Sequence, residues 1–175
     1  ENENALRMTT KLFSGFINQT EYSQKRIARS FNYTGRQNRD IYSKQIESDI
    51  SFRPSQILEF SLKGRFSREK DVEYEIPTQV YSYALIPQFS YSIRNKGRFR
   101  SEVEWSYVKL TPDGRIIPYE MAMGRSPGYS TRWDIRFDYR ISEVIMATIS
   151  YSGRNEPERN RLIHAGQAQV TASFR

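Results

Sequence analysis

Hydrophobic and polar residues alternate over long stretches of this chain, most regularly in residues 131–141. In that stretch every second residue from Trp133 to Ile141 is large and apolar, and the residues between them are alternately Arg and Asp. Successive side chains of a β-strand point to opposite faces, so the pattern predicts a strand with one apolar and one charged face. The apolar face must leave water, either for a protein core or for lipid.

The same alternation predicts eight strands in all, because turn-forming residues divide the chain into segments of this kind. The predicted strands span residues 5–17, 40–52, 56–66, 78–93, 97–110, 131–141, 143–153 and 161–174. The polar stretch 18–39 is expected to be a loop. Within it, residues 26–35 could form a ninth strand or extend the first hairpin.

The predicted connections alternate between long and short along the chain. The segments 18–39, 67–77, 111–127 and 154–160 are long, whereas 53–55, 94–96 and 141–142 are short. Bacterial outer-membrane barrels have an even number of antiparallel strands, with short turns at one end and longer loops at the other. The pattern therefore predicts one all-β domain over residues 1–175, an antiparallel up-and-down transmembrane β-barrel of about eight strands with both chain ends on the short-turn side.

Composition is compatible with a membrane barrel. Transmembrane strands need only every second residue to be apolar, so the mean hydropathy of −0.75 does not argue against a membrane span. The chain has 12 Tyr, 10 Phe and 2 Trp, which is many for one small core and suits contact with lipid. The alternative is a soluble, lipocalin-like barrel that binds an apolar ligand and keeps its aromatic face inside.

The polar face carries charges of both signs in near balance. If it lines a narrow barrel, nine cations meet seven anions, and paired charges are tolerated where unpaired ones are costly. Eight strands leave room for side chains and little more. We therefore expect a filled, salt-bridged lumen and a non-enzymatic role as a surface anchor or interaction protein, with a narrow channel or small-solute transporter as the alternative. The cations are Arg7, Lys11, Lys63, Arg65, Arg98, Arg100, Arg132, Arg136 and Arg140, and the anions are Glu47, Asp49, Glu59, Glu102, Glu104, Asp134 and Asp138.

Residues suited to catalysis or metal binding are few. The chain has no cysteine, which excludes disulfides, thiolate catalysis and cysteine-based zinc sites. Its one histidine, His164, falls on the apolar face by parity, where a packing or interfacial role is expected. The acid pairs Glu102/Glu104 and Asp134/Asp138 lie beside arginines, which favours ordinary salt bridges. We predict no enzyme activity, catalytic residue, metal or cofactor.

Basic residues point to anionic partners, although not to nucleic acid. The net charge is +7, but the cations are dispersed and often alternate with acids, so no single patch stands out. The stretch 18–39 is an exception, because it holds five clustered cations and Glu21 as its one acid. We predict that these cations contact lipopolysaccharide phosphates or an envelope protein partner, with a merely solvated loop as the alternative. They are Lys25, Arg26, Arg29, Arg36 and Arg39.

The last predicted strand carries a family resemblance. Residues 162–174 alternate small or apolar residues and end on Phe174, which resembles the closing strand of Gram-negative outer-membrane barrels, although Arg175 follows where that family usually stops. The resemblance implies an outer-membrane location and recognition by the barrel-insertion machinery during biogenesis. The run from Ile117 through Trp133 and Tyr139 to Phe174 is also similar to the barrel domain of large uncharacterised envelope proteins. Whether the barrel closes within residues 1–175, or belongs to a larger protein, stays open.

Overall fold

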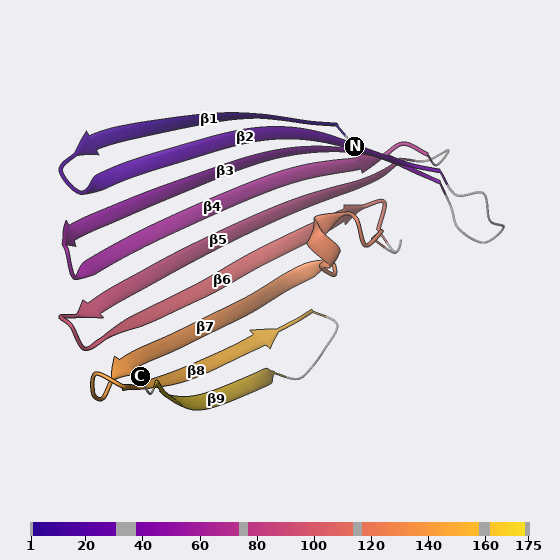
Figure 1. The fold of residues 1–175 in the computed structure, drawn as a ribbon. Coiled ribbons are helices and arrows are strands. Elements are labelled where there is room, and N and C mark those ends of the chain that lie inside the picture. Colours follow the sequence, from indigo (N-terminus) through magenta and orange to yellow (C-terminus); the bar gives the residue numbers. More distant parts are fainter. Residues whose placement is uncertain (1, 31–37, 74–76, 114–116, 158–161, 174–175) are drawn as a thin grey trace.

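The computed structural model describes residues 2–30, 38–73, 77–113, 117–157 and 162–173, which form one antiparallel sheet. Each strand pairs with the next strand along the chain (Figure 1). The predicted all-β, up-and-down arrangement is confirmed. The elements are β1 (Asn2–Phe13), β2 (Phe16–Arg29), β3 (Arg39–Ser55), β4 (Leu58–Asp71), β5 (Thr78–Ile93), β6 (Gly97–Thr111), the 3-10 helix η1 (Ala122–Gly124), β7 (Gly128–Arg140), β8 (Ile145–Asn155) and β9 (Ile163–Ala172).

The described chain has nine strands, one more than expected, because most of the predicted loop 18–39 belongs to β2. A two-residue turn at Ser14 and Gly15 separates β2 from β1. Gly15 has a φ of +80°, and a Cβ there would lie 2.4 Å from the carbonyl oxygen of Arg53, so the turn requires glycine. The extra strand lies at 16–29 and so contains residues 26–29 of the suggested range 26–35. Residues 31–35 lie outside the described residues.

Short and long connections lie at opposite ends of the sheet, as the sequence predicts (Figure 1). We call these the turn end and the loop end. Two details differ: β4 continues to Asp71, and the tight turn at Ile141 runs over four residues before β8 begins at Ile145. The additional hairpin also reverses the first strand, so β1 starts at the loop end and not on the short-turn side as expected.

The two faces of the sheet differ as the alternation predicts. Register places charged residues of several neighbouring strands opposite one another on one face, for example Arg98 opposite Asp138 and Glu47 opposite Arg65. We call this face the inner face. The opposite, outer face carries the large apolar side chains, of which Tyr83 is 48% and Trp105 50% exposed. A lipocalin-like barrel would have the reverse arrangement. No helix in the described part of the chain is long and apolar enough to cross a membrane.

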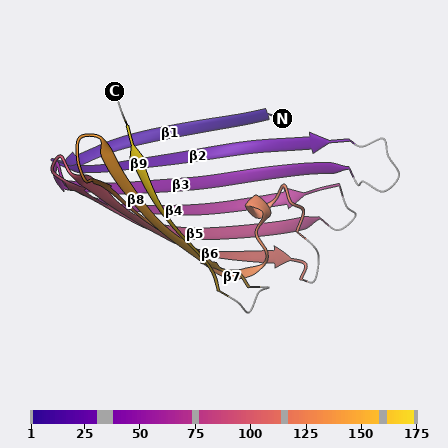
Figure 2. The same cartoon turned by 60° about the horizontal axis from the view of Figure 1, so that its bottom comes forward.

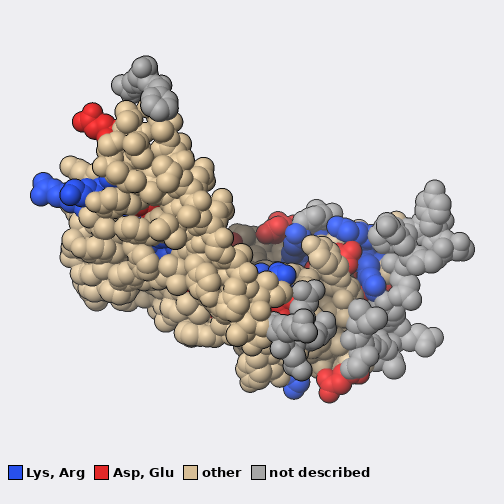
Figure 3. Space-filling view, turned by 90° about the horizontal axis from the view of Figure 1, so that it is seen from below, with Lys and Arg blue, Asp and Glu red and all other residues tan. Residues whose placement is uncertain are grey.

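The sheet curls into an open trough. Its curvature is visible in Figure 2, and Figure 3 shows a largely uncharged surface with charged side chains gathered in the hollow and toward the strand ends. Hydrogen-bonded neighbours run from β1 to β9 without a bond between those two strands. The closed eight-stranded barrel therefore stays a prediction, although the curled antiparallel sheet is confirmed.

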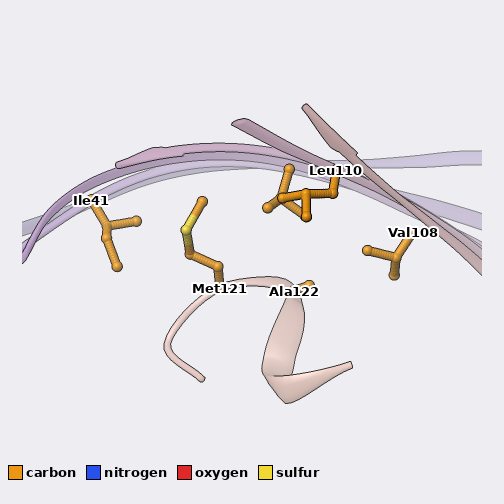
Figure 4. Close-up of a cluster of buried hydrophobic side chains, with 6 residues drawn as sticks. Ile41, Val108, Leu110, Met121 and Ala122 are labelled. Carbon is orange, nitrogen blue, oxygen red and sulfur yellow. The ribbon is translucent and has the colours of Figure 1, made fainter. Parts of the chain in front are cut away.

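A small core lies on the inner face near the loop end. Side chains from β3, β5 and β6 meet two residues of the segment that joins β6 to β7, and all are almost fully buried (Figure 4). Most other large apolar residues stay exposed on the outer face. The chain thus buries little apolar surface within itself. The core consists of Ile41, Val80, Val108, Leu110, Met121 and Ala122.

Candidate functional site

The charged inner face forms ion pairs between neighbouring strands and within a strand. Glu47 on β3 accepts from Arg65 at 2.8 Å and lies 3.5 Å from the Lys63 ammonium, both on β4. Asp138 on β7 lies 3.2 Å from Arg100 and 3.0 Å from Arg136. Register sets Glu47 opposite Arg65 and sets Asp138 diagonal to Arg100, whereas Arg136 precedes Asp138 by two residues on the same face of β7. These pairs therefore follow directly from the sequence pattern. The predicted salt-bridged inner face is confirmed for these groups.

Two rows of the inner face bring like charges together. Glu102 lies opposite Asp134, and Arg100 lies opposite Arg136 in the next such row. The carboxylate of Glu102 accepts a hydrogen bond from the Gln88 amide at 2.8 Å. Alternating rows of acids and bases let diagonal neighbours attract, so this region is a neutralised, polar lining.

A polar hollow of about 380 Å³ opens on this lining toward the turn end. Its walls carry both charge signs together with hydroxyl and amide groups, which suits water and small polar solutes. Its charged lining residues are Glu59, Arg98, Arg100, Glu102, Asp134 and Arg136.

The loop end of the inner face is covered by residues 117–127, which we call the inner loop. Its Glu120 carboxylate lies 3.2 Å from the guanidinium of Arg29 on β2. Its Arg125 lies 2.5 Å from Glu104 on β6. These two contacts come from strands four places apart in the sheet, so the inner loop extends over the inner face from β2 to β6.

The middle of the inner loop is fixed by β4 and by the small core. The backbone N–H of Ala122 donates to the buried Glu69 carboxylate at 2.6 Å. Met121 is fully buried between the loop and the strands, as Figure 4 shows. Ala122 and Met123 have φ angles of 51° and 55°, and such left-handed backbone costs energy for residues with a Cβ. The surrounding contacts therefore hold the loop in an otherwise unfavourable bend.

The sequence did not predict the inner loop as part of a site. Its turn residues suggested an ordinary surface connection, and its burial depends on contacts with β2, β4 and β6. The one usable signal is the apolar pair Met121 and Ala122 between Glu120 and Arg125 in a segment otherwise rich in turn residues.

The five cations predicted to bind lipopolysaccharide or a protein partner do not lie on one face. Register places Lys25, Arg29 and Arg39 on the inner face, where Arg39 lies 3.2 Å from Asp71. Arg26 lies on the outer face and pairs with Asp40, and Arg36 lies outside the described residues. Their contact with lipopolysaccharide or a partner stays a prediction, since these positions do not test it.

His164 lies on the outer face, as parity predicts. Its Nδ1 is 2.7 Å from the Tyr151 hydroxyl, and its ring centroid is 5.7 Å from that of Trp133. This aromatic setting is consistent with the packing role expected from the sequence. In the described ranges, no group of three or more His, Asp or Glu residues is placed to hold a metal ion.

A curled antiparallel meander with an apolar outer face and a charged inner face resembles the fold of outer-membrane β-barrel proteins. One similar solved structure is in-vitro folded OmpT, an outer membrane protein of Vibrio cholerae, with a TM-score of 0.64 and 10% identity over 86% of this chain and 44% of that one. Outer-membrane expressed OmpT of Vibrio cholerae has a TM-score of 0.64 and 10% identity, over 87% of this chain and 46% of that one. The trimer form of the in-vitro folded protein has a TM-score of 0.62 and 10% identity, over 95% of this chain and 52% of that one.

At this identity the likeness concerns the fold alone, and the chain spans about half the length of the solved structures that it matches. No model of a known protein family matches the sequence. No curated protein matches it at the level of sequence either. The resemblance to large envelope proteins is therefore not confirmed.

Proposed function

We propose that this chain forms part of the wall of an outer-membrane β-barrel whose interior is an aqueous passage narrowed by the inner loop. The position of that loop carries the proposal, because it lies across the charged, concave face of the sheet (Figure 2). The exposed aromatic outer face supports contact with lipid. The similar Vibrio cholerae structures support the outer membrane of a Gram-negative bacterium as the location.

The directions of the edge strands favour a barrel larger than these nine strands. Eight connections reverse the chain between β1 and β9, so both strands run from the loop end to the turn end. Direct pairing of β1 with β9 would be parallel, whereas barrels of this class are antiparallel. An odd number of further strands between β9 and β1 would restore antiparallel pairing. Those strands would also pair the backbone N–H and C=O groups of both edges, which must be hydrogen-bonded within the hydrocarbon of a bilayer.

Barrel size separates a passage from a filled lumen. The expectation of a filled lumen rests on closure by eight strands, which leaves an interior just wide enough for side chains. Nine strands here match about half of the solved structures, and barrels of roughly 16 to 18 strands enclose an aqueous channel. With both charge signs along its wall, such a passage would admit small polar solutes with little preference for cations or anions.

Conductance of the intact protein in a planar bilayer tests this proposal. We expect stepwise, ohmic conductance from the wild type. Replacing Arg125 by Ala should enlarge the steps or make them noisier, because it frees one end of the inner loop. Tyr119→Ala is the matched control, since that side chain belongs to the same loop and is 85% exposed.

A folded protein that does not conduct would contradict the passage. That result would favour the second candidate, a non-enzymatic surface anchor or interaction protein with a salt-bridged interior, which the ion pairs around Glu47 and Asp138 support. Neither candidate involves a catalytic step. In both, the barrel-insertion machinery is the expected partner during biogenesis, and β9 keeps the alternation that such a closing strand needs.

A further inference from the structure

Basic side chains on the outer face gather at one height. In the described strands, every Lys or Arg of the outer face falls within two neighbouring rows at the loop end. Register sets Lys44 opposite Arg68, Arg68 opposite Tyr81, and Tyr81 opposite Lys109. The next row places Arg26 opposite Tyr42 and Tyr42 opposite Lys70. We call Arg26, Lys44, Arg68, Lys70 and Lys109 the cationic belt.

The cationic belt has little acidic compensation. Within the described strands Asp40 is the one acid on the outer face, and it forms an ion pair with Arg26 at 2.8 Å. The five cations of the belt and Asp40 together carry a net charge of +4. Lys44 and Lys109 are exposed, and neither forms an ion pair within the described residues. These charges are available to an external anion.

Aromatic neighbours hold part of the belt in place. The Arg68 guanidinium lies 5.6 Å from the centroid of the Tyr81 ring and donates to Gln79 at 3.3 Å. Arg26 lies 4.9 Å from the centroid of Tyr42. Both contacts hold a guanidinium group beside an aromatic ring of the outer face.

The belt lies at the upper edge of an apolar band. On β4, Arg68 lies ten positions after Leu58. That length is about 33 Å along the strand and about 25 Å in height at a tilt near 40°, which is the height of the lipid-facing band of such barrels. The outward residues between them are Phe60, Leu62, Gly64 and Phe66.

An aromatic row lies just inside the belt. Phe66, Tyr83, Tyr107 and Tyr129 follow one another across four strands, with ring centroids 5.1, 6.4 and 4.5 Å apart. Aromatic girdles of this kind mark the membrane interface. Cations directly beyond such a girdle, on the loop side, lie at the height of the lipid head groups.

We propose that the cationic belt binds the phosphate groups of lipids in the leaflet at the loop end. A free anion would need only the charges, whereas this surface joins the charges to an apolar band and so fits a molecule with acyl chains below its phosphates. Neighbouring strands lie about 4.8 Å apart, so Lys44 and Arg68 can share one phosphate while Lys109, two strands farther on, reaches a second. The proposal rests on the membrane-spanning role proposed above.

Lipid binding by the intact protein in uncharged detergent micelles tests the belt. The probes are lipid A with both phosphates and the same lipid after their removal. The wild type should bind the phosphorylated form about tenfold or more tightly, and a belt variant should lose that preference. A control with the same change of charge at the turn end should keep it. The belt variant is Lys44→Gln, Arg68→Gln, Lys70→Gln and Lys109→Gln, and the control is Arg53→Gln, Arg94→Gln, Lys96→Gln and Arg140→Gln.

Equal binding of the two lipids by the wild type, or an unchanged preference in the belt variant, would overturn the proposal. Displacement of the lipid by an equal concentration of inorganic pyrophosphate would show that the belt binds a free phosphate anion equally well, and would overturn the assignment to lipid. The conductance measurement stays separate. Phosphate preference without conductance overturns the passage alone, and conductance without phosphate preference overturns the belt alone.

Discussion

Glu104 on β6 and Arg125 of the inner loop form an ion pair with 2.5 Å between Oε1 and Nη2, and their side chains are only 13% and 14% exposed. Shielding from water strengthens such a pair and makes it costly to remove one partner. Arg125 lies three residues before Gly128, where β7 starts. The pair therefore fixes the inner loop to the sheet just before the chain leaves the interior.

A double-mutant cycle on this pair should show coupling. Glu104→Gln and Arg125→Gln should each lower the free energy of unfolding by about 1–3 kcal/mol, because each leaves a shielded charge without its partner. The double variant should lose less than the sum of the two. Urea unfolding in detergent micelles measures all three, and strictly additive losses would contradict the pairing.

Replacing Met121 by Ala should release the inner loop. Met121 is fully buried in the small core, so its truncation should cost about 2–5 kcal/mol of loop docking. Met123, two residues on and 56% exposed, is the matched control, and its change to Ala should cost under about 0.5 kcal/mol. Limited proteolysis at Arg125 reports the docking, and equal cleavage of the two variants would rule out the expected packing.

Gly153 permits the position of Trp133 on the outer face. A Cβ at Gly153 would lie 2.2 Å from a carbon of the indole ring, so Gly153→Ala should displace that ring. Gly166→Ala is the control, since nothing lies within 4 Å of a Cβ there. In a Trp105→Phe background the fluorescence of Trp133 should shift with the first change and not with the second. An unchanged spectrum in both would argue against this contact.

Adjacent residues of β4 should respond oppositely to a charge. Leu62 points outward and Ser61 points inward to Gln88, with 3.0 Å between their oxygens. Leu62→Arg should destabilise the protein in a bilayer by about 2–4 kcal/mol, because the cation would face hydrocarbon. Ser61→Arg should be tolerated in the polar interior. Folding yield into lipid vesicles distinguishes them, and similar yields would contradict the assignment of the faces.

The sequence predicted a strand best where its two faces differ most. Residues 131–141 alternate without a break, and β7 occupies Gly128–Arg140 with the expected faces. β2 was not predicted as a strand because its outer face carries the polar residues Asn18 and Thr20, which interrupt the alternation. These polar groups are matched across strands by Ser48, whose hydroxyl donates to Asn18 at 3.2 Å and lies 3.3 Å from that of Thr20. A pattern read along one strand does not reveal such a partner.

Features built from several strands lay beyond the sequence. The cationic belt joins Lys44, Arg68 and Lys109, which are far apart in the chain and become neighbours only through the register of β3 to β6. A basic stretch such as 18–39 looked more specific because its cations are close in sequence. Alternation within β2 then divides those cations between two faces, since adjacent residues of a strand point in opposite directions.

The shared direction of β1 and β9 also limits how copies of this sheet could assemble. Two copies inserted with their loop ends on the same side of a membrane would offer each other only edges that run the same way. Homotypic joining through these edges would be parallel, contrary to the pairing inside each copy. The edges thus accept only a strand that runs in the opposite direction. Any dimer or trimer of the protein should therefore form through outer surfaces, with each barrel wall built from a single chain.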